Sequence, residues 1–236
     1  MDAVLHKANT RGHANHGWLN SWHTFSFAGY YDPTRVHFGA LRVLNDDTVA
    51  PGMGFGKHRH DNMEIISIPL EGDLEHQDSM GNRQVIRQGD VQTMSAGTGL
   101  THSEKNKNSD QFVKFLQIWV FPNQQNVKPR YDQKTFSESD KHNRLATIVS
   151  PMGSSEGVQI YQDAWFSLGK LNPGIKLDYL LRQSGNGVYV FVLEGDVTID
   201  EFALNRRDGL GITGRDRLAI KADTEVEILL MEVPML

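Results

Sequence analysis

The fold is decided by the stretch EIISIPLEGDLEHQD, residues 64–78, in which an apolar run ends at the tetrapeptide LEGD (70–73) and a second strand-like run follows. Apolar and β-branched residues on both sides of a Gly-Asp turn are typical of a β-hairpin. The same tetrapeptide returns in GVYVFVLEGDVTID, residues 187–200, again after an apolar run. A further pair of Gly and Asp follows each copy, at 89–90 and 208–209. These shared surroundings indicate a duplicated β-domain.

The rest of the chain continues the strand-like pattern. Short apolar or β-branched runs such as FVKFLQIWVF and EVEILLMEV alternate with turn clusters such as SMGN and NPG, whereas windows with helical spacing are scarce. The 22 glycines suit a chain with many tight turns. We therefore expect an all-β protein of two tandem β-barrels. The expected division is an N-terminal barrel in residues 1–125, a polar linker in 126–143 and a C-terminal barrel in 144–236.

The composition excludes several classes of protein. The 24 Lys and Arg residues are outnumbered by 29 Asp and Glu residues, which argues against a surface that binds nucleic acid or an anionic membrane. There is no cysteine, so a disulfide framework and a thiolate ligand are excluded, and a metal would need His, Asp or Glu. The first twenty residues carry charges where a signal peptide needs an apolar stretch, and no apolar run could span a membrane. We expect a cytoplasmic location.

Histidines are concentrated in the N-terminal part, where nine of the ten lie within the first 102 residues. His58 and His60 are two residues apart, so on a strand both rings face the same side. His102 and Glu104 repeat this spacing. If two such strands meet inside a barrel, three imidazoles and one carboxylate converge, a set suited to one divalent transition metal. Four protein ligands would leave open positions, which a catalytic metal requires.

Other residues near this set have more than one interpretation. Glu64 shares the face of the first two histidines if the strand is unbroken, and it is then a rival ligand, an acceptor that orients a ligand, or a buried acid; we rank the acceptor first. His76 faces the same interior as His58 only if the register of the hairpin allows it, and we prefer to interpret it as an exposed strand histidine beside two acidic residues. Four aromatic residues either cover a pocket or pack in the core of the first strands, and we favour the core for at least two: Trp18, Trp22, Phe25 and Phe27.

Two spaced motifs resemble those of the cupin superfamily. The first is G-x5-H-x-H-x3-E, which starts at Gly52, and the second is SAGTGLTH, residues 95–102. Six longer blocks sharpen the resemblance, since together and in this order they are similar to the pirin family of bicupins. They are GHANHGWLNSWHTFSFAGYYDP (12–33), LRVLNDD (41–47), HRHDNMEI (58–65), LEGDLEHQDSMGN (70–82), SAGTGLTHSEKN (95–106) and LQIWVFP (116–122).

The resemblance to pirins implies two stacked cupin barrels of the jelly-roll type, with the metal in the N-terminal one. Carried over residue by residue, its three histidines and one glutamate are His58, His60, His102 and Glu104. Many other cupins take the glutamate from the first motif, which would be Glu64, whereas the pirin pattern takes it from H-x-E and favours Glu104. Alignment on the two LEGD turns places Leu181 and Gln183 where the first two histidines stand. We therefore expect no metal in the C-terminal barrel.

The resemblance also implies an activity, because bacterial pirins are associated with quercetin 2,3-dioxygenase activity. A flavonol would bind the metal through its 3-hydroxyl, lose the proton to Glu104 or, as runner-up, Glu64, and react with O2 with loss of carbon monoxide. Fe(II) is the expected metal, and Mn, Co, Ni, Cu and Zn stay open because intrinsic affinity favours nickel or copper over iron. The expected partners are a small phenol and O2, without direct nucleic-acid or membrane contact, and the expected state is a monomer.

Two other classes of function stay open at this point. Eukaryotic pirins modulate transcription through other proteins, with the iron state as a switch, so a metal-responsive regulator with a protein partner is one alternative. Another small-molecule cupin enzyme is the second, because one fold hosts many reactions.

Overall fold

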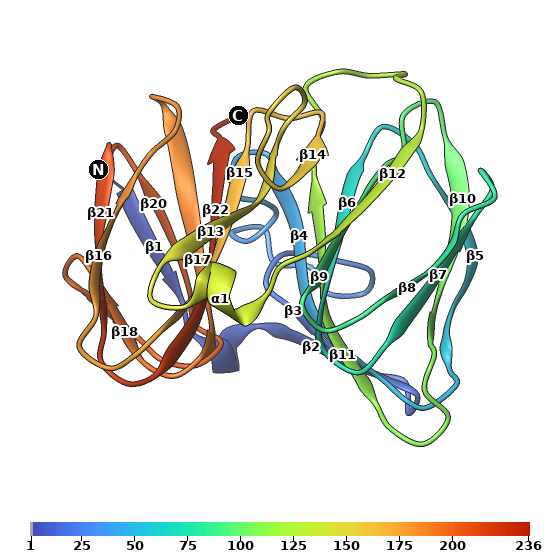
Figure 1. Ribbon diagram of the computed structural model, residues 1–236, viewed down its shortest axis with the longest axis horizontal. Helices are drawn as coiled ribbons and strands as arrows, with labels where there is room; N and C mark the ends of the chain where they lie inside the picture. The colour runs from blue at the N-terminus through green and yellow to red at the C-terminus, as the bar shows by residue number, and fades with distance from the viewer. Residues whose placement is uncertain (1) are drawn as a thin grey trace.

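The protein is described from a computed structural model, which covers residues 2–236. It consists of four β-sheet layers, with two seven-stranded sheets in the middle and a four-stranded sheet on each outer side (Figure 1). The two layers of the N-terminal half lie on the right in Figure 1, and those of the C-terminal half on the left. Within each half the two sheets face one another without joining into one hydrogen-bonded barrel, so each half is an open jelly roll.

The strands follow the same order in both halves, except for the two edge strands of each inner sheet. In the N-terminal half the inner sheet is β12 (Arg130–Thr135), β9 (Asp90–Ser95), β6 (Glu64–Glu71), β11 (Val113–Val120), β4 (Leu41–Val49), β3 (Leu19–His23) and β2 (Gly12–Asn15), and the outer sheet is β5 (Gly54–His60), β10 (Leu100–Asn106), β7 (Leu74–Asp78) and β8 (Arg83–Ile86). In the C-terminal half the inner sheet is β1 (Asp2–His6), β20 (Gly209–Thr213), β17 (Asn186–Glu194), β22 (Val226–Pro234), β15 (Trp165–Leu171), β13 (Leu145–Pro151) and β14 (Val158–Ile160). Its outer sheet is β16 (Lys176–Leu180), β21 (Arg217–Ala222), β18 (Val197–Ile199) and β19 (Phe202–Leu204).

This arrangement confirms the prediction of an all-β chain with two cupin-type halves. The LEGD turns connect equivalent strands, β6 to β7 in one half and β17 to β18 in the other. Gly72 and Gly195 in these turns adopt φ values of 76° and 81°, in the left-handed region that favours glycine. The duplication read from the tetrapeptide therefore extends to the backbone of the turn.

The segment that we expect to be a linker, residues 126–143, contains regular structure. Its strand β12 pairs with β9 and extends the N-terminal inner sheet, and the short helix α1 (Glu138–Lys141) follows. At the other end of the chain, β1 pairs with β20 of the C-terminal half, before the one-turn helix η1 (Ala8–Thr10). The polar sequence RYDQKT concealed β12 because edge strands often carry charged and polar residues. The two boundaries between the three expected segments stay predictions.

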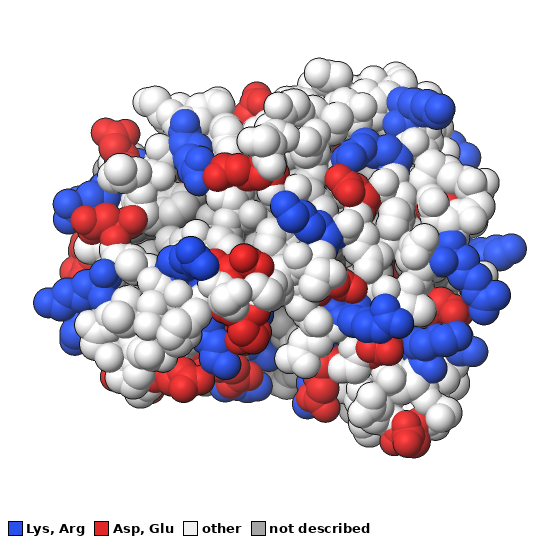
Figure 2. All heavy atoms as spheres, viewed as in Figure 1, with Lys and Arg blue, Asp and Glu red and all other residues white. Residues whose placement is uncertain are grey.

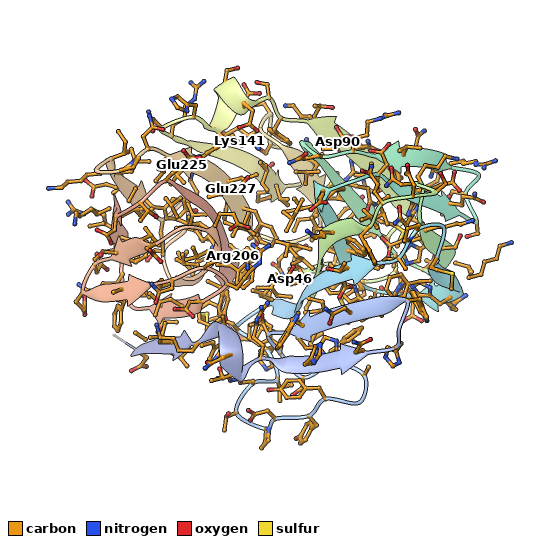
Figure 3. The ribbon with its side chains drawn as sticks, turned by 90° about the horizontal axis from the view of Figure 1, so that it is seen from below. Asp46, Asp90, Lys141, Arg206, Glu225 and Glu227 are labelled. Carbon is orange, nitrogen blue, oxygen red and sulfur yellow. The ribbon has the colours of Figure 1, made fainter. Side chains whose placement is uncertain are left out.

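The two halves are joined by an apolar core and by ion pairs. Ile66 and Ile118 from the N-terminal inner sheet belong to the same buried cluster as Phe166 and Leu229 from the C-terminal one. Asp46 of β4, which Figure 3 shows between the two halves, forms an ion pair with Arg207 at 2.9 Å and accepts a hydrogen bond from Arg11 at 3.3 Å. Lys141 of α1 lies 3.7 Å from Glu227 of β22, and both are labelled in Figure 3. The apolar cluster and the Asp46–Arg207 ion pair fix the N-terminal inner sheet against the C-terminal half, and the Lys141 pair holds α1 against that half.

The interiors of the two halves differ. Sixteen buried apolar side chains form one cluster inside the C-terminal half. The N-terminal half instead contains two smaller apolar clusters, one around Phe115 and one around Met94. Polar side chains occupy part of the space between its sheets, as described below. On the face shown in Figure 2, Lys and Arg side chains lie beside Asp and Glu side chains over most of the surface. No helix within residues 2–236 is long and apolar enough to cross a membrane.

Candidate metal centre

Two neighbouring strands bring the three histidines together. β5 and β10 pair antiparallel, with His102 opposite His58 and Leu100 opposite His60. Because alternate residues of a strand share a face, the three rings point to the same side. The ring centroids are 4.8 Å apart for His58 and His60, 4.4 Å for His58 and His102, and 5.0 Å for His60 and His102. One ring nitrogen of each lies within 4.8 Å of the others, as a shared metal ion requires.

The histidine nitrogens have the chemistry of metal ligands. His58 Nδ1 lies 2.8 Å from the carbonyl oxygen of Gly56, so it donates there and leaves the lone pair on Nε2. His102 Nε2 is buried and has no hydrogen-bond partner among residues 2–236. Burial, assisted by the neighbouring imidazoles, lowers the pKa of His102 to about 3 and that of His60 to about 4. Neutral imidazoles with an unpaired lone pair fit a divalent transition metal.

Glu104 bridges the two sheets of the N-terminal half. It is buried, and its Oε1 accepts from Ser67 Oγ at 3.0 Å while its Oε2 accepts from Gln117 Nε2 at 2.6 Å. Ser67 and Gln117 lie on β6 and β11 of the facing sheet. Its carboxylate is grouped, within 4.8 Å, with His102 and His76. The structure therefore places the three predicted histidines in one potential metal-binding group and Glu104 in a second group that shares His102.

Glu64 lies on a different face from the histidines, because the unbroken strand on which a shared face depended is not formed. The chain turns between β5 and β6, where Asn62 adopts a φ of 45°, so the strand is broken. Ile66, two residues further along β6, packs in the core between the two inner sheets. Glu64 is on this same side and accepts from Ser95 Oγ at 2.7 Å. The geometry gives it no contact with the histidines.

We predict a pH-dependent effect for Glu64→Gln. Burial raises the pKa of Glu64 from 4.5 to about 7. The stability of the wild type therefore falls as the pH rises through this interval, because the carboxyl group ionises less readily in the folded than in the unfolded state. The glutamine variant keeps an acceptor for Ser95 and lacks this penalty. Its advantage in unfolding free energy should grow by roughly 2 kcal/mol between pH 5 and pH 8. Urea unfolding at both pH values measures it, with exposed Glu71→Gln as control, and a difference independent of pH would contradict it.

His76 is buried, so its interpretation as an exposed strand histidine is wrong. On β7 it lies opposite Glu104 of β10, and its ring centroid is 5.3 Å from that of His102. Its Nε2 is 3.1 Å from Asp78 Oδ2. The acidic neighbours in the sequence suggested exposure, although the spacing His-x-Asp repeats that of the two predicted ligand pairs.

A cavity of about 660 Å³ opens over His58 and His60. This volume lies in the range of small-molecule sites. Trp119 meets the His60 ring edge-on at 4.9 Å, and Phe27 meets Trp119 in the same way at 5.4 Å. Both line the cavity together with His58, His60 and Glu104. The aromatic side chains provide flat apolar surfaces directly beside the candidate metal ligands.

Of the four N-terminal aromatic residues, Phe27 alone lines this cavity. Phe25 is buried in the core between the halves, and Trp18 packs against Phe55, which confirms the core interpretation for these two. Trp22 stacks on His13 at 4.1 Å between ring centroids and borders a different hollow of the surface.

A row of polar side chains crosses the wall of the inner sheet. Strand pairing places Ser67, Gln117, Asn45 and His23 side by side on β6, β11, β4 and β3. Asn45 Oδ1 and His23 Nδ1 are buried without a hydrogen-bond partner in the described chain, and both residues line the cavity. Asp47, two residues after Asn45 and on the same face of β4, accepts from Ser21 Oγ, and burial raises its pKa to about 7. These unpaired groups would suit a ligand with hydroxyl groups.

Comparison with known proteins assigns the family. Residues 4–120 match the family described as Pirin, and residues 147–233 match the one described as Quercetinase C-terminal cupin domain. The chain is 43% identical over 232 residues to a protein named quercetin 2,3-dioxygenase from Escherichia coli K12, and this alignment covers 98% of each chain. The chain belongs to the pirin family. This pirin is also 37% identical over 222 residues to a pirin-like protein from Caulobacter vibrioides, which covers 94% and 95% of the two chains.

A solved structure of a relative links the family to a metal. The bacterial pirin YhhW from Escherichia coli, in complex with nickel(II), aligns with all of this pirin at a TM-score of 0.94 and 41% identity, and all of the YhhW chain is covered as well. Together with the cluster of His58, His60 and His102, this supports one divalent metal in the N-terminal half. The ligand set of this pirin stays a proposal.

Proposed function

We propose that this pirin is a metal-dependent dioxygenase that opens the ring of a flavonol such as quercetin with O2 and releases carbon monoxide. The observation that carries the proposal is the ligand-sized cavity whose surface includes Glu104 and two of the three clustered histidines, His58 and His60. The relatives named quercetin 2,3-dioxygenase support it. The proposed ligands are His58, His60, His102 and Glu104, and the proposed metal is Fe(II), although the nickel complex of YhhW shows that a relative accepts nickel.

The cavity residues have distinct roles in this proposal. A divalent metal would supply Lewis acidity that lowers the pKa of the flavonol 3-hydroxyl. Glu104 would take the hydroxyl proton, while its hydrogen bonds from Ser67 and Gln117 hold the carboxylate in place. Trp119 and Phe27 would contact the planar rings and exclude water. The hydroxyl groups of the flavonol would pair with the unpaired oxygen of Asn45 on the cavity wall.

Glu64 takes no part in this mechanism, because its side chain lies on the side of the inner sheet opposite to the cavity. The other parts of the proposal are those expected from the sequence. The substrates are a small phenol and O2, and the protein acts as a monomer in the cytoplasm.

The role of the 3-hydroxyl gives a direct test. Fe(II)-loaded protein should degrade quercetin, measured as the loss of its long-wavelength absorbance under air, and should leave unchanged a flavone that lacks only the 3-hydroxyl. The flavone should still bind in the cavity and quench Trp119 fluorescence, because the apolar contacts are retained. Absence of quercetin turnover in metal-loaded protein would contradict the dioxygenase proposal and favour a metal-responsive regulator or another cupin reaction.

A further inference from the structure

A chain of three buried side chains lies behind the metal-binding face. Asp78 Oδ2 is 3.1 Å from His76 Nε2, and His76 Nδ1 is 3.5 Å from His102 Nδ1. The side chains of Asp78 and His76 are fully buried. The chain ends at His102, whose other ring nitrogen, Nε2, is buried without a partner in the described chain, and His102 belongs to the group of potential ligands with His58 and His60. Asp78 and His76 therefore connect to the candidate metal position through His102.

The chemistry of these groups fixes where each proton lies. Asp78 accepts from the backbone N–H groups of Met80 and Asn82 and from Asn82 Nδ2, so its carboxylate is surrounded by donors. An ionised carboxylate only accepts, so His76 Nε2 carries the proton of that contact. The neutral His76 ring then has its lone pair on Nδ1 and accepts from His102 Nδ1–H. His102 is left with its lone pair on Nε2, the nitrogen that a metal on this face would use.

We propose that Asp78 and His76 form a positioning relay that holds His102 in the Nδ1–H tautomer and so presents Nε2 to a divalent metal. This inference rests on the proposed metal site. His76 is grouped with His102 and Glu104 as a potential ligand, but the relay uses both of its nitrogens. His76 is therefore a positioning residue, and a histidine that orients another histidine takes the place of the usual carbonyl or carboxylate.

The relay is closed off by the strand that extends the inner sheet. Tyr131 of β12 lies against His76, with 5.0 Å between ring centroids, and its hydroxyl donates to Gln133 at 2.6 Å. The tyrosine thus covers one side of the His76 ring. Residues 130–135, which lie between the two segments matched to known families, contribute in this way to the metal-binding half.

Three substitutions test the relay through the affinity for nickel(II), measured by competition with a chromophoric chelator. Asp78→Asn replaces an acceptor with an amide that donates to His76 Nε2, which reverses both tautomers and should weaken affinity about 10- to 100-fold. His76→Gln, which offers no acceptor at the Nδ1 position, should weaken it similarly. His76→Asn places an amide oxygen close to the former Nδ1 and should stay within about threefold of wild type.

The matched control is His6→Gln, since His6 is another buried histidine, on β1 in the opposite half of the protein, whose Nδ1 hydrogen-bonds the Tyr189 hydroxyl at 2.9 Å. It should leave nickel affinity unchanged even if it lowers stability. Equal loss in His76→Asn and His76→Gln, or unchanged affinity in Asp78→Asn, would overturn the relay.

A second measurement needs neither metal nor substrate, and it can be made even if the Asp78→Asn variant does not fold. Long-range ¹H–¹⁵N spectra of metal-free wild-type protein report which ring nitrogen of each histidine is protonated. We expect His102 in the Nδ1–H form and His76 in the Nε2–H form, and His102 in the Nε2–H form in the His76→Gln variant. An Nε2–H form of His102 in the wild type would overturn the inference, whatever reaction the protein catalyses.

Discussion

The His102→Ala variant is expected to bind divalent metal at least about 100-fold more weakly than the wild type. Loss of a residue that merely orients a ligand costs 10- to 100-fold in affinity, and loss of the ligand itself costs at least as much. His102 has the most buried nitrogen of the cluster and belongs to both groups of potential ligands, so its removal affects every arrangement that the structure allows. Nickel(II) competition titration at pH 7 measures the effect.

The control for this prediction is exposed His142→Ala, which removes an imidazole far from the cluster and should leave the affinity unchanged. Thermal unfolding without metal shows whether His102→Ala retains the fold. If it is lost, His58→Ala serves instead, because the half-exposed His58 ring leaves a gap that solvent can fill. Full metal occupancy in a folded variant of either residue would refute the assignment of the metal site.

The second large effect is expected for Glu104→Gln, which should slow flavonol turnover by roughly 10²- to 10⁴-fold, the usual contribution of a general base. The amide still accepts a hydrogen bond from Gln117 or Ser67, so the variant should fold. It cannot take a proton from the flavonol. Metal affinity should fall less than in His102→Ala, because three imidazoles stay in place. Steady-state kinetics with metal-saturated protein separates the two effects.

Glu75→Gln is the matched control, since Glu75 is a buried carboxylate on the neighbouring strand whose partners are Lys107 and Arg83 at the surface. It should keep turnover within a few-fold of wild type. Unchanged turnover in metal-saturated Glu104→Gln would remove Glu104 from the mechanism, and a fall in metal affinity equal to that of His102→Ala would make it a ligand of equal weight.

Local sequence patterns predicted the parts of the fold that depend on neighbouring residues. The LEGD turns and their flanking apolar runs identified the duplicated hairpin, and alternation along β5 and β10 placed the three histidines on one face. The strand β12 was missed because its polar residues carry no apolar alternation, and its pairing with β9 is a long-range contact. The open edges of the sheets, in place of closed barrels, likewise depend on pairing that no local pattern records.

The candidate site was likewise predictable where it depends on local sequence patterns and not where it depends on long-range contacts. Whether Glu64 shares the face of the histidines depended on one unbroken strand, and the turn at Asn62 instead places it on the face between the two halves. Trp119 and Gln117 are two residues apart, so both can face the cavity from one strand. That strand lies in the sheet opposite the histidines, and no local pattern indicates this contact between sheets. His76 became recognisable only when its pairing with Glu104 and the cover from Tyr131 were known.

The most direct test of the central claim is carbon monoxide release from quercetin under air, measured with protein reconstituted anaerobically with Fe(II). The parallel samples are the same protein stripped by chelator and the His102→Ala variant treated with the same Fe(II). The proposed site predicts carbon monoxide in proportion to quercetin consumed in the first sample and none above background in the other two. No carbon monoxide from protein shown to hold its metal, or equal release by the His102→Ala variant, would contradict the account.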